Sequence, residues 1–238
     1  VERATSVRST LKNRFDDFAS HFNLFVEEAN AALRKKNLGK EILFIVDGLE
    51  KTMTTDTRRK IIMEETNRIR QIEAYTLLPI ELMKERQILK RSFFVETFPF
   101  VKLLDKNDQR RTEAFDQFKE FVYKRIEKSL FENDQVVEEA IYFSGGSPRE
   151  LLIILKMANI HADRAKGLIE KTALERALRR LANQTAQYVT ALQWEKIKYV
   201  AEHKSSDWDD TIQDLLERLL LMEYNDGNYK RPNPILKL

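Results

Sequence analysis

The run Glu41-Ile42-Leu43-Phe44-Ile45-Val46-Asp47-Gly48 is apolar over five consecutive positions and ends at an Asp-Gly pair. Polar and apolar residues do not alternate within it, as they would in a strand with one solvated face. An unbroken apolar run rich in β-branched residues is typical of a strand buried on both faces of a parallel sheet. The run therefore predicts an α/β fold, with Asp47 at the end of the strand.

Helices and further strands are predicted on both sides of this run. Before it, apolar residues recur every three or four positions over residues 6–36, which indicates an amphipathic helix that we expect to break near His21. After it, we expect a helix from residues 55–56 to about residue 70. Residues 74–78 precede a proline and predict a second parallel strand, and a third strand is expected within residues 93–98.

Beyond residue 104 the sequence predicts mainly helices. Periodic apolar residues and start signals indicate helices over residues 108–131, 136–143, 148–159, 172–188, 194–203 and 208–221. Thr172 and Glu175 provide the spacing of a capping box for the fourth of these. An Asp-Gly pair between aromatic residues then signals a β-hairpin at residues 223–229. Helix, helix, hairpin is the order of a winged-helix module.

The stretch Ser144-Gly145-Gly146-Ser147-Pro148-Arg149-Glu150-Leu151-Leu152 contains the clearest helix start in the chain. Ser147, Pro148 and Glu150 have the spacing of an N-cap, a first-turn proline and the acid of a capping box. Arg149 lies in the first turn, where the helix dipole mildly disfavours a cation, so an anion or a partner is expected nearby. The alternative is a solvated arginine within a capping sequence.

Asp47 is the first candidate for chemistry, because open α/β sheets bind ligands at the carboxyl ends of their strands. In nucleotide hydrolases an acid at this place holds magnesium, since the hard cation prefers carboxylate oxygens. A strand that simply ends at an Asp-Gly turn explains the same residues equally well.

Composition excludes several classes of protein. The 238 residues are 42% hydrophobic and 33% charged, with a mean hydropathy of −0.50, which is the balance of a folded, water-soluble chain. No apolar stretch approaches the ~20 residues of a membrane span. The absence of cysteine excludes disulfides, cysteine nucleophiles and Cys-based zinc sites, and it fits a cytoplasmic location. The three histidines have no metal-ligand spacing, and no Gly-x-Ser-x-Gly elbow occurs.

Taken together, three motifs resemble those of P-loop ATPases of the AAA+ and STAND type. Residues 42–50 look like a Walker B strand, residues 75–79 resemble the end of the sensor 1 strand, and residues 144–151 look like the sensor 2 motif. The order continues into a winged helix, so the resemblance covers roughly residues 37–238. It implies the C-terminal part of an α/β ATPase core at residues 1–104, a helical lid at 105–188 and a winged-helix domain at 189–238.

The resemblance also implies roles for single residues, with ATP and Mg²⁺ as cofactors. Asp47 would order the magnesium, and Glu50 would polarise or position the attacking water. Thr76 would sense the γ-phosphate, and Arg149 would contact it across the lid. Gly48 occupies the position that carries the catalytic acid in many relatives.

The larger departure is the lack of a Walker A motif, Gly-x-x-x-x-Gly-Lys-Ser/Thr. Gly39-Lys40 comes nearest, but Arg34 stands in place of the first glycine and Glu41 replaces the hydroxyl residue. Without backbone amides and a lysine around the phosphates, neither tight ATP binding nor hydrolysis is expected. We therefore expect the C-terminal part of a longer ATPase switch, inactive alone, whose partner is an upstream Walker A segment. A homo-oligomer is compatible with this resemblance.

The alternative function is a non-enzymatic winged-helix module that binds nucleic acid or protein. Residues 189–238 hold seven basic and nine acidic residues, a net charge of −2, which disfavours contact with phosphates. Residues 164–180 hold six basic and two acidic residues, although the six do not share one stripe. Nucleic-acid binding, if present, is thus expected to be weak and to fall on this segment.

Overall fold

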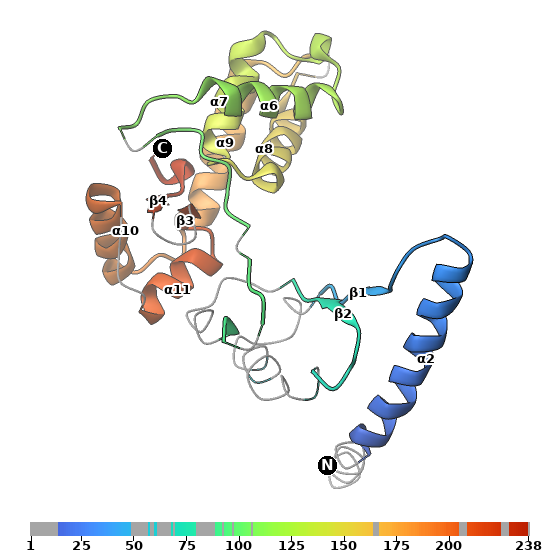
Figure 1. Cartoon of the computed structure of the whole chain (residues 1–238). Helices are drawn as coiled ribbons and strands as arrows, with labels where there is room; N and C mark the ends of the chain where they lie inside the picture. The colour runs from blue at the N-terminus through green and yellow to red at the C-terminus, as the bar shows by residue number, and fades with distance from the viewer. Residues whose placement is uncertain are drawn as a thin grey trace, which may run out of the picture. The chain divides into compact units, whose positions relative to one another are not determined.

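The structure is a computed structural model in which two units are distinguished, Val1–Glu81 and Leu82–Leu238. It describes residues 14–48, 70–79, 89–91, 93–96, 98–105, 107–163, 167–204, 209–224 and 229–237, together with Thr57, Lys60 and Arg68. Most of this part of the chain is helical, with two small sheets of two strands each (Figure 1). The broad expectation of a mostly helical α/β chain is confirmed. The expected boundaries at residues 104 and 188 stay predictions.

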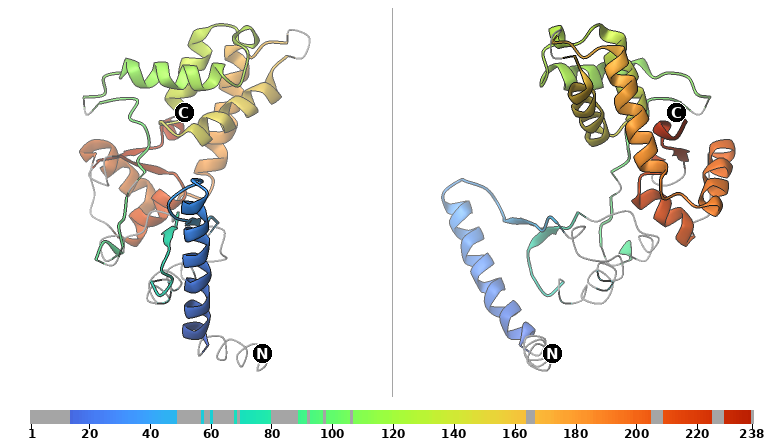
Figure 2. Two further views of the ribbon diagram at one scale, coloured as in Figure 1. Left: turned by 45° about the vertical axis from the view of Figure 1, so that its right-hand side comes forward. Right: turned by 180° about the vertical axis from the view of Figure 1, so that it is seen from behind.

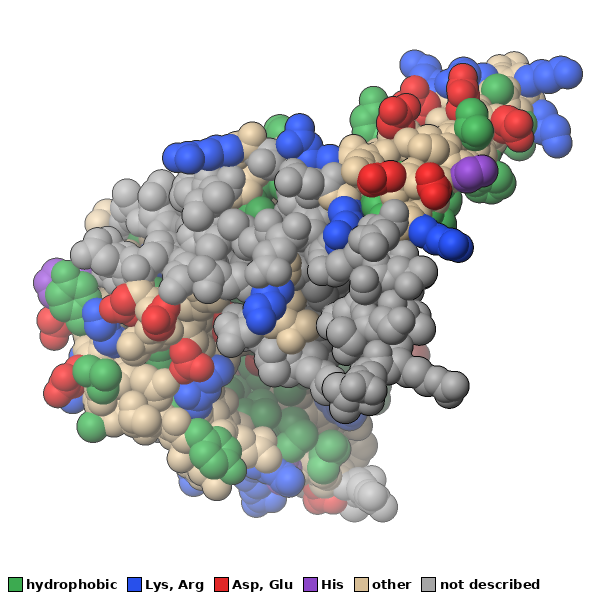
Figure 3. Space-filling view, turned by 90° about the horizontal axis from the view of Figure 1, so that it is seen from below, with side chains coloured by type: hydrophobic (Ala, Val, Ile, Leu, Met, Phe, Trp, Pro, Cys, Tyr) green, Lys and Arg blue, Asp and Glu red, His purple; other side chains and the backbone are tan. Residues whose placement is uncertain are grey.

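The first unit begins with helix α2, Phe15–Lys35. Acids in its first turn and basic residues in its last turn complement the helix dipole. The expected break near His21 is wrong: no glycine or proline interrupts α2, and His21 Nδ1 lies 2.7 Å from the carbonyl oxygen of Asp17 within the regular turn. Within α2 all acidic side chains precede the basic ones, which lie in its last turn; the helix is at the right of the space-filling view (Figure 3).

Two strands of this unit pair in parallel, β1 (Leu43–Ile45) with β2 (Tyr75–Leu77), which confirms the two predicted strands. Phe44 lies opposite Thr76, and the Phe44 ring packs on Phe22 of α2 with ring centroids 5.5 Å apart. Burial on both faces was predicted and is wrong, since Leu43 and Ile45 are 54% and 62% exposed. Within the described residues α2 covers the Phe44 face only.

Two further predictions concern a third strand within residues 93–98 and a helix up to about residue 70. The third strand expected within residues 93–98 is absent from the described residues 93–96 and 98. Phe94 and Phe98 are almost fully exposed there, and no neighbouring strand within the described chain supplies hydrogen bonds. The helix expected up to about residue 70 falls mostly outside the described residues, although Thr57, Lys60 and Arg68 are helical.

A bundle of helices forms the first part of the second unit. Its elements are α6 (Thr112–Tyr123), the 3₁₀ helix η2 (Lys128–Leu130), α7 (Asp134–Phe143), α8 (Pro148–His161) and α9 (Lys171–Ala186). Helices α8 and α9 lie side by side in both views of Figure 2. The core contains buried apolar side chains from all four α-helices, among them Phe115, Phe118, Val122, Val137, Ile141, Leu151, Ile154, Leu155, Leu174 and Leu178.

Two helix boundaries in the bundle differ from the prediction. Residues 108–131 do not form one helix. The Asp105 carboxylate accepts hydrogen bonds from the N–H groups of Asn107 and Gln109 and closes a turn before α6, which ends at Tyr123, before η2. Helix α9 begins one residue before Thr172, with Glu170 as the N-cap residue, so the expected capping box is not used. Helices α7 and α8 begin and end close to their predicted limits.

The second part of this unit comprises two helices and a hairpin, in the predicted order. Helix α10 (Ala191–His203) starts at a true capping box of Thr190 and Gln193, and α11 (Asp210–Glu217) ends before the expected position. Strands β3 (Leu221–Tyr224) and β4 (Tyr229–Pro232) pair antiparallel, and the 3₁₀ helix η4 (Pro234–Lys237) follows. The hairpin is therefore confirmed, while its turn lies outside the described residues. No helix in the described part of the chain combines the length and apolar character of a membrane span.

Candidate functional site

Asp47 lies just beyond the carboxyl end of β1. The Val46 N–H donates to the Leu77 carbonyl at 3.0 Å, so the pairing of the two strands continues to the residue before it. Gly48 then turns the chain with a φ of +96°, a conformation that side-chain-bearing residues rarely adopt. Asp47 is exposed, and the described residues contain no cluster of three or more metal-ligating side chains. Glu50 lies outside the described residues.

Thr76 lies on the neighbouring strand, in the middle of β2. Its register partner is Phe44, so Thr76 shares the sheet face that α2 covers. The side chain is half-buried, and its hydroxyl donates to the carbonyl of Ala74 at 3.4 Å. Asp47 and Thr76 thus belong to adjacent parallel strands, with Thr76 opposite a residue three positions before Asp47.

Arg149 follows a tightly hydrogen-bonded loop between α7 and α8. The Ser144 hydroxyl donates to the Ile141 carbonyl at 2.7 Å and accepts from the Gly146 N–H at 3.2 Å. The Ser147 hydroxyl accepts from the Glu150 N–H at 3.3 Å and caps α8, as its sequence predicts. The Arg149 side chain is exposed and makes no hydrogen bond or ion pair with any described residue. It is therefore available for an anion.

Glu150 adjoins Arg149 in the same helical turn. Burial raises the pKa of Glu150, and the neighbouring Arg149 charge partly opposes this shift. The Glu150 side chain does not complete a capping box, because the Ser147 N–H that it would accept from donates to the Ser144 carbonyl instead. The local charge at this helix start is set by one exposed cation beside one partly buried carboxyl group.

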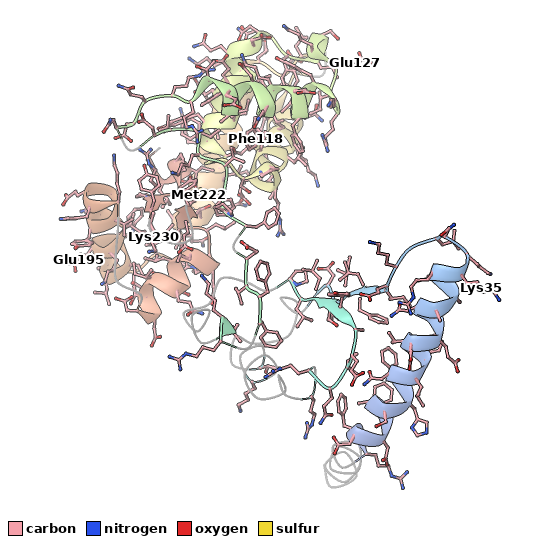
Figure 4. All side chains as sticks on the ribbon, viewed as in Figure 1. Lys35, Phe118, Glu127, Glu195, Met222 and Lys230 are labelled. Carbon is pink, nitrogen blue, oxygen red and sulfur yellow. The ribbon has the colours of Figure 1, made fainter. Side chains whose placement is uncertain are left out.

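The glycines of this loop are required by close packing against two other segments. A Cβ on Gly146, which has a φ of +86°, would lie 1.8 Å from the Val101 carbonyl oxygen. The Val101 N–H in turn donates to the Gly146 carbonyl at 3.1 Å. A Cβ on Gly145 would lie 2.1 Å from the sulfur of Met222 in β3, a residue labelled in Figure 4.

Strand β3 also holds the loop by a hydrogen bond. The Tyr224 hydroxyl donates to the Gly145 carbonyl at 2.6 Å, and burial raises the pKa of Tyr224, so the phenol stays neutral and remains a donor. Sequence reasoning missed Tyr224 and Val101, since both contacts are long-range. The only signal in the sequence was the pair Gly145-Gly146, because the end of a helix ordinarily requires one glycine and not two.

A cavity of about 130 Å³ lies beside this loop. Asp108, Lys204 and Arg231, which we call the Asp108 cluster, form part of its lining. The Asp108 carboxylate forms a salt bridge with Lys204 at 3.0 Å and another with Arg231. The hydrogen bond from Lys204 contributes most to a lowered pKa of Asp108, and the Arg231 charge adds to it. Asp108 and Lys204 both have left-handed backbone, with φ of +64° and +55°. The cluster connects the turn before α6 with the end of α10 and with β4.

A second, more open cavity of about 590 Å³ lies between the segment that follows α6, helix α8 and residues 167–169. Leu152 and Leu155 form part of its apolar lining, and Arg125 and Lys156 lie at it together with Glu127. Its mixed lining does not converge on one chemistry. The loop before Arg149 is therefore the better-defined site of the second unit.

The four residues expected to handle nucleotide are thus distributed over the chain. Asp47 and Thr76 are brought onto adjacent strands of the first unit, whereas Arg149 belongs to the second, and Glu50 is not described. Asp47 and Arg149 each present an exposed charge to solvent. Comparison of the chain with models of protein families, with curated proteins and with solved structures found no match.

Proposed function

We propose that this chain forms part of an ATP-binding and hydrolysing molecular switch of the AAA+ or STAND type, to which a separate segment contributes the phosphate-binding loop. The observation that carries the proposal is the parallel pairing of β1 with β2. In the resemblance, these are the Walker B and sensor 1 strands, which must be parallel neighbours if they are to present polar side chains at one sheet edge. A chance pair of apolar runs would not have to pair in this way.

In this proposal Asp47 orders Mg²⁺, usually through water, and Glu50 positions the attacking water. Magnesium favours carboxylate oxygens and keeps several of its own waters, so one exposed carboxylate is an adequate protein ligand beside the nucleotide phosphates. Thr76, to which the resemblance assigns sensing of the γ-phosphate, lies on the neighbouring strand three register positions before Asp47. The phosphates would have to be held by a Walker A loop that the sequence does not contain.

Arg149 is the proposed contact from the lid. Its side chain is exposed and unpaired among the described residues, and α8 fixes its backbone through the Ser147 cap. The preceding loop is held by Val101 and by Tyr224 of β3. A phosphate bound by Arg149 would therefore act on a helix start that is rigidly connected to the C-terminal hairpin, and gain or loss of that phosphate would be felt by the proposed winged helix.

The test uses the protein extended by its upstream coding sequence, with Mg²⁺-ATPase turnover as the readout. We expect Asp47→Asn and Arg149→Ala each to reduce turnover at least tenfold with an unchanged thermal midpoint, because both side chains are exposed. Arg111→Ala is the matched control, since Arg111 is another exposed arginine at a helix start. Equal turnover in the Arg149 and Arg111 variants would refute the sensor role.

A second measurement tests the missing phosphate loop. The 238-residue chain alone should show no binding of ATP and Mg²⁺ by calorimetry at micromolar concentrations, because its main phosphate contacts are absent. Micromolar binding would mean that the site is complete without a Walker A motif, which contradicts the proposal. An upstream sequence without Gly-x-x-x-x-Gly-Lys-Ser/Thr would also contradict it.

A further inference from the structure

Helix α9 presents three arginines on one exposed face, Arg176, Arg179 and Arg180, which we call the α9 arginine stripe. At 100° per residue, the three side chains fall within an arc of about 100°. The opposite face packs into the bundle core through Leu174 and Leu178, each at most 1% exposed. The core therefore fixes the direction in which the stripe points.

Within the described residues the arginines of the stripe form no ion pair, in contrast to many cations elsewhere in the second unit. Arg110 and Lys119 pair with Glu138, Lys124 pairs with Glu120, Lys128 with Asp134, Lys196 with Asp209, and Arg218 with Asp214. No described acid lies within ion-pair distance of Arg176, Arg179 or Arg180. Even Glu175, one turn before Arg179, forms no ion pair with it. Among the described residues no acid neutralises the stripe, which leaves its charge available to an external anion.

The rest of the exposed face of α9 narrows the class of partner. It consists of polar residues: Lys171, Thr172, Glu175, Asn183 and Gln184. A helix that lies on a membrane needs an apolar face directed at the lipid, and a protein interface ordinarily needs an aromatic or aliphatic anchor in its centre. The exposed face of α9 has neither. Arginine forks flanked by hydroxyl and amide groups are instead the groups that contact phosphates.

We propose that the α9 arginine stripe binds the sugar-phosphate backbone of a nucleic acid, without reading its sequence. Arg176 and Arg180 are separated by about 6 Å along the helix, which spans roughly two charges of a strand with one phosphate per 3.4 Å of axis. Arg179 lies between them on the same face. This binding is independent of the proposed ATPase, since it needs neither nucleotide nor the first unit.

The net charge of residues 189–238 supports nucleic-acid binding by α9 rather than by the C-terminal hairpin and helices. Residues 189–238 carry a net charge of −2, whereas α9 alone carries four basic residues and one acid, a net charge of +3. Nucleic acid approaching the second unit would therefore be repelled by the one segment and attracted by the other. We therefore place the phosphate contacts on α9 and not on residues 189–238.

Fluorescence anisotropy with a labelled duplex DNA at several salt concentrations tests the proposal. Three phosphate contacts predict a slope of about −2.7 in log K against log salt, and hence a loss of affinity of roughly 40-fold between 50 and 200 mM salt. Replacing all three arginines of the stripe by glutamine should weaken binding at 50 mM salt at least tenfold and bring the slope close to zero. Glutamine keeps helix propensity, so the circular dichroism spectrum should not change.

The matched control replaces Lys124, Lys128 and Lys196 by glutamine, which removes the same total charge from lysines that already pair with acids. We expect its affinity to stay within threefold of the unmodified chain. Equal losses in the two triple variants would mean that net charge alone is measured and would overturn the proposal. It would also be overturned by absence of DNA binding at 50 mM salt, or by binding to phosphatidylserine vesicles in place of DNA.

Discussion

Replacement of Gly146 by alanine is expected to be among the most damaging single changes in the second unit. The added Cβ would lie 1.8 Å from the Val101 carbonyl oxygen, well inside the 3.0 Å below which Cβ contacts essentially do not occur. Backbone oxygen cannot rotate away as a side chain can, so the loop or the Val101 segment has to move.

The cost can be assembled from three contributions. A left-handed alanine costs about 1–2 kcal/mol relative to glycine. Loss of the hydrogen bond from the Val101 N–H to the Gly146 carbonyl costs about 1 kcal/mol, and the displaced packing costs about 1–3 kcal/mol. We therefore expect Gly146→Ala to lower the free energy of unfolding by at least about 3 kcal/mol, a large share of the ~5–15 kcal/mol that a typical domain has.

Gly167→Ala is the matched control, because Gly167 also has a positive φ, of +66°, but a Cβ there would meet no atom within 4 Å among the described residues. It should cost only the conformational contribution of about 1–2 kcal/mol. Urea unfolding followed by circular dichroism measures both variants on the whole chain. Equal midpoints for the two variants would refute the close packing of Gly146 on Val101.

Three further outcomes are expected from the same urea assay. Hydrogen bonds from the Arg110 guanidinium and the Lys119 ammonium group lower the pKa of Glu138 from 4.5 to about 2. The Glu138 carboxylate therefore stabilises the fold fully above pH 4.5, and this stabilisation is lost as the pH falls toward 2. Glu138→Gln should therefore cost about 1 kcal/mol at pH 7 and progressively less below pH 4, whereas a pH-independent cost would contradict the pairing. Thr190→Val removes the acceptor of the α10 capping box and should cost about 1 kcal/mol, measured against Thr172→Val, which should cost less. Tyr224→Phe should cost about 1–2 kcal/mol by leaving the buried Gly145 carbonyl without its donor, and an unchanged midpoint would refute that hydrogen bond.

Features that depend on neighbouring residues were predictable from the sequence. The cap at Ser147 and the first-turn proline concern only four consecutive residues, and the structure has both. The two parallel strands were recognisable because each combines a short apolar run with a turn signal at its end. The hairpin followed from its Asp-Gly pair in the same way.

Features that depend on distant contacts were not predictable. Whether both faces of β1 would be covered depends on what packs against it, and α2 contacts only the Phe44 side within the described residues. The interruption before α6 arises from side-chain hydrogen bonds of Asp105, a competition that helical periodicity does not reveal. The partners of the loop at Gly145 are separated from it by tens of residues, so their identity requires the fold itself.

The Asp108 cluster has an energetic property of its own. Asp108 is 62% exposed in its side chain, so its attraction to Lys204 contributes only about 0–1 kcal/mol. Holding Lys204 in the left-handed conformation costs about 1–2 kcal/mol, so the attraction at most offsets this cost. The cluster therefore connects β4 and the end of α10 with the turn before α6 while adding almost nothing to their stability. A contact with so little net free energy can be exchanged for another arrangement without unfolding the helices that it joins.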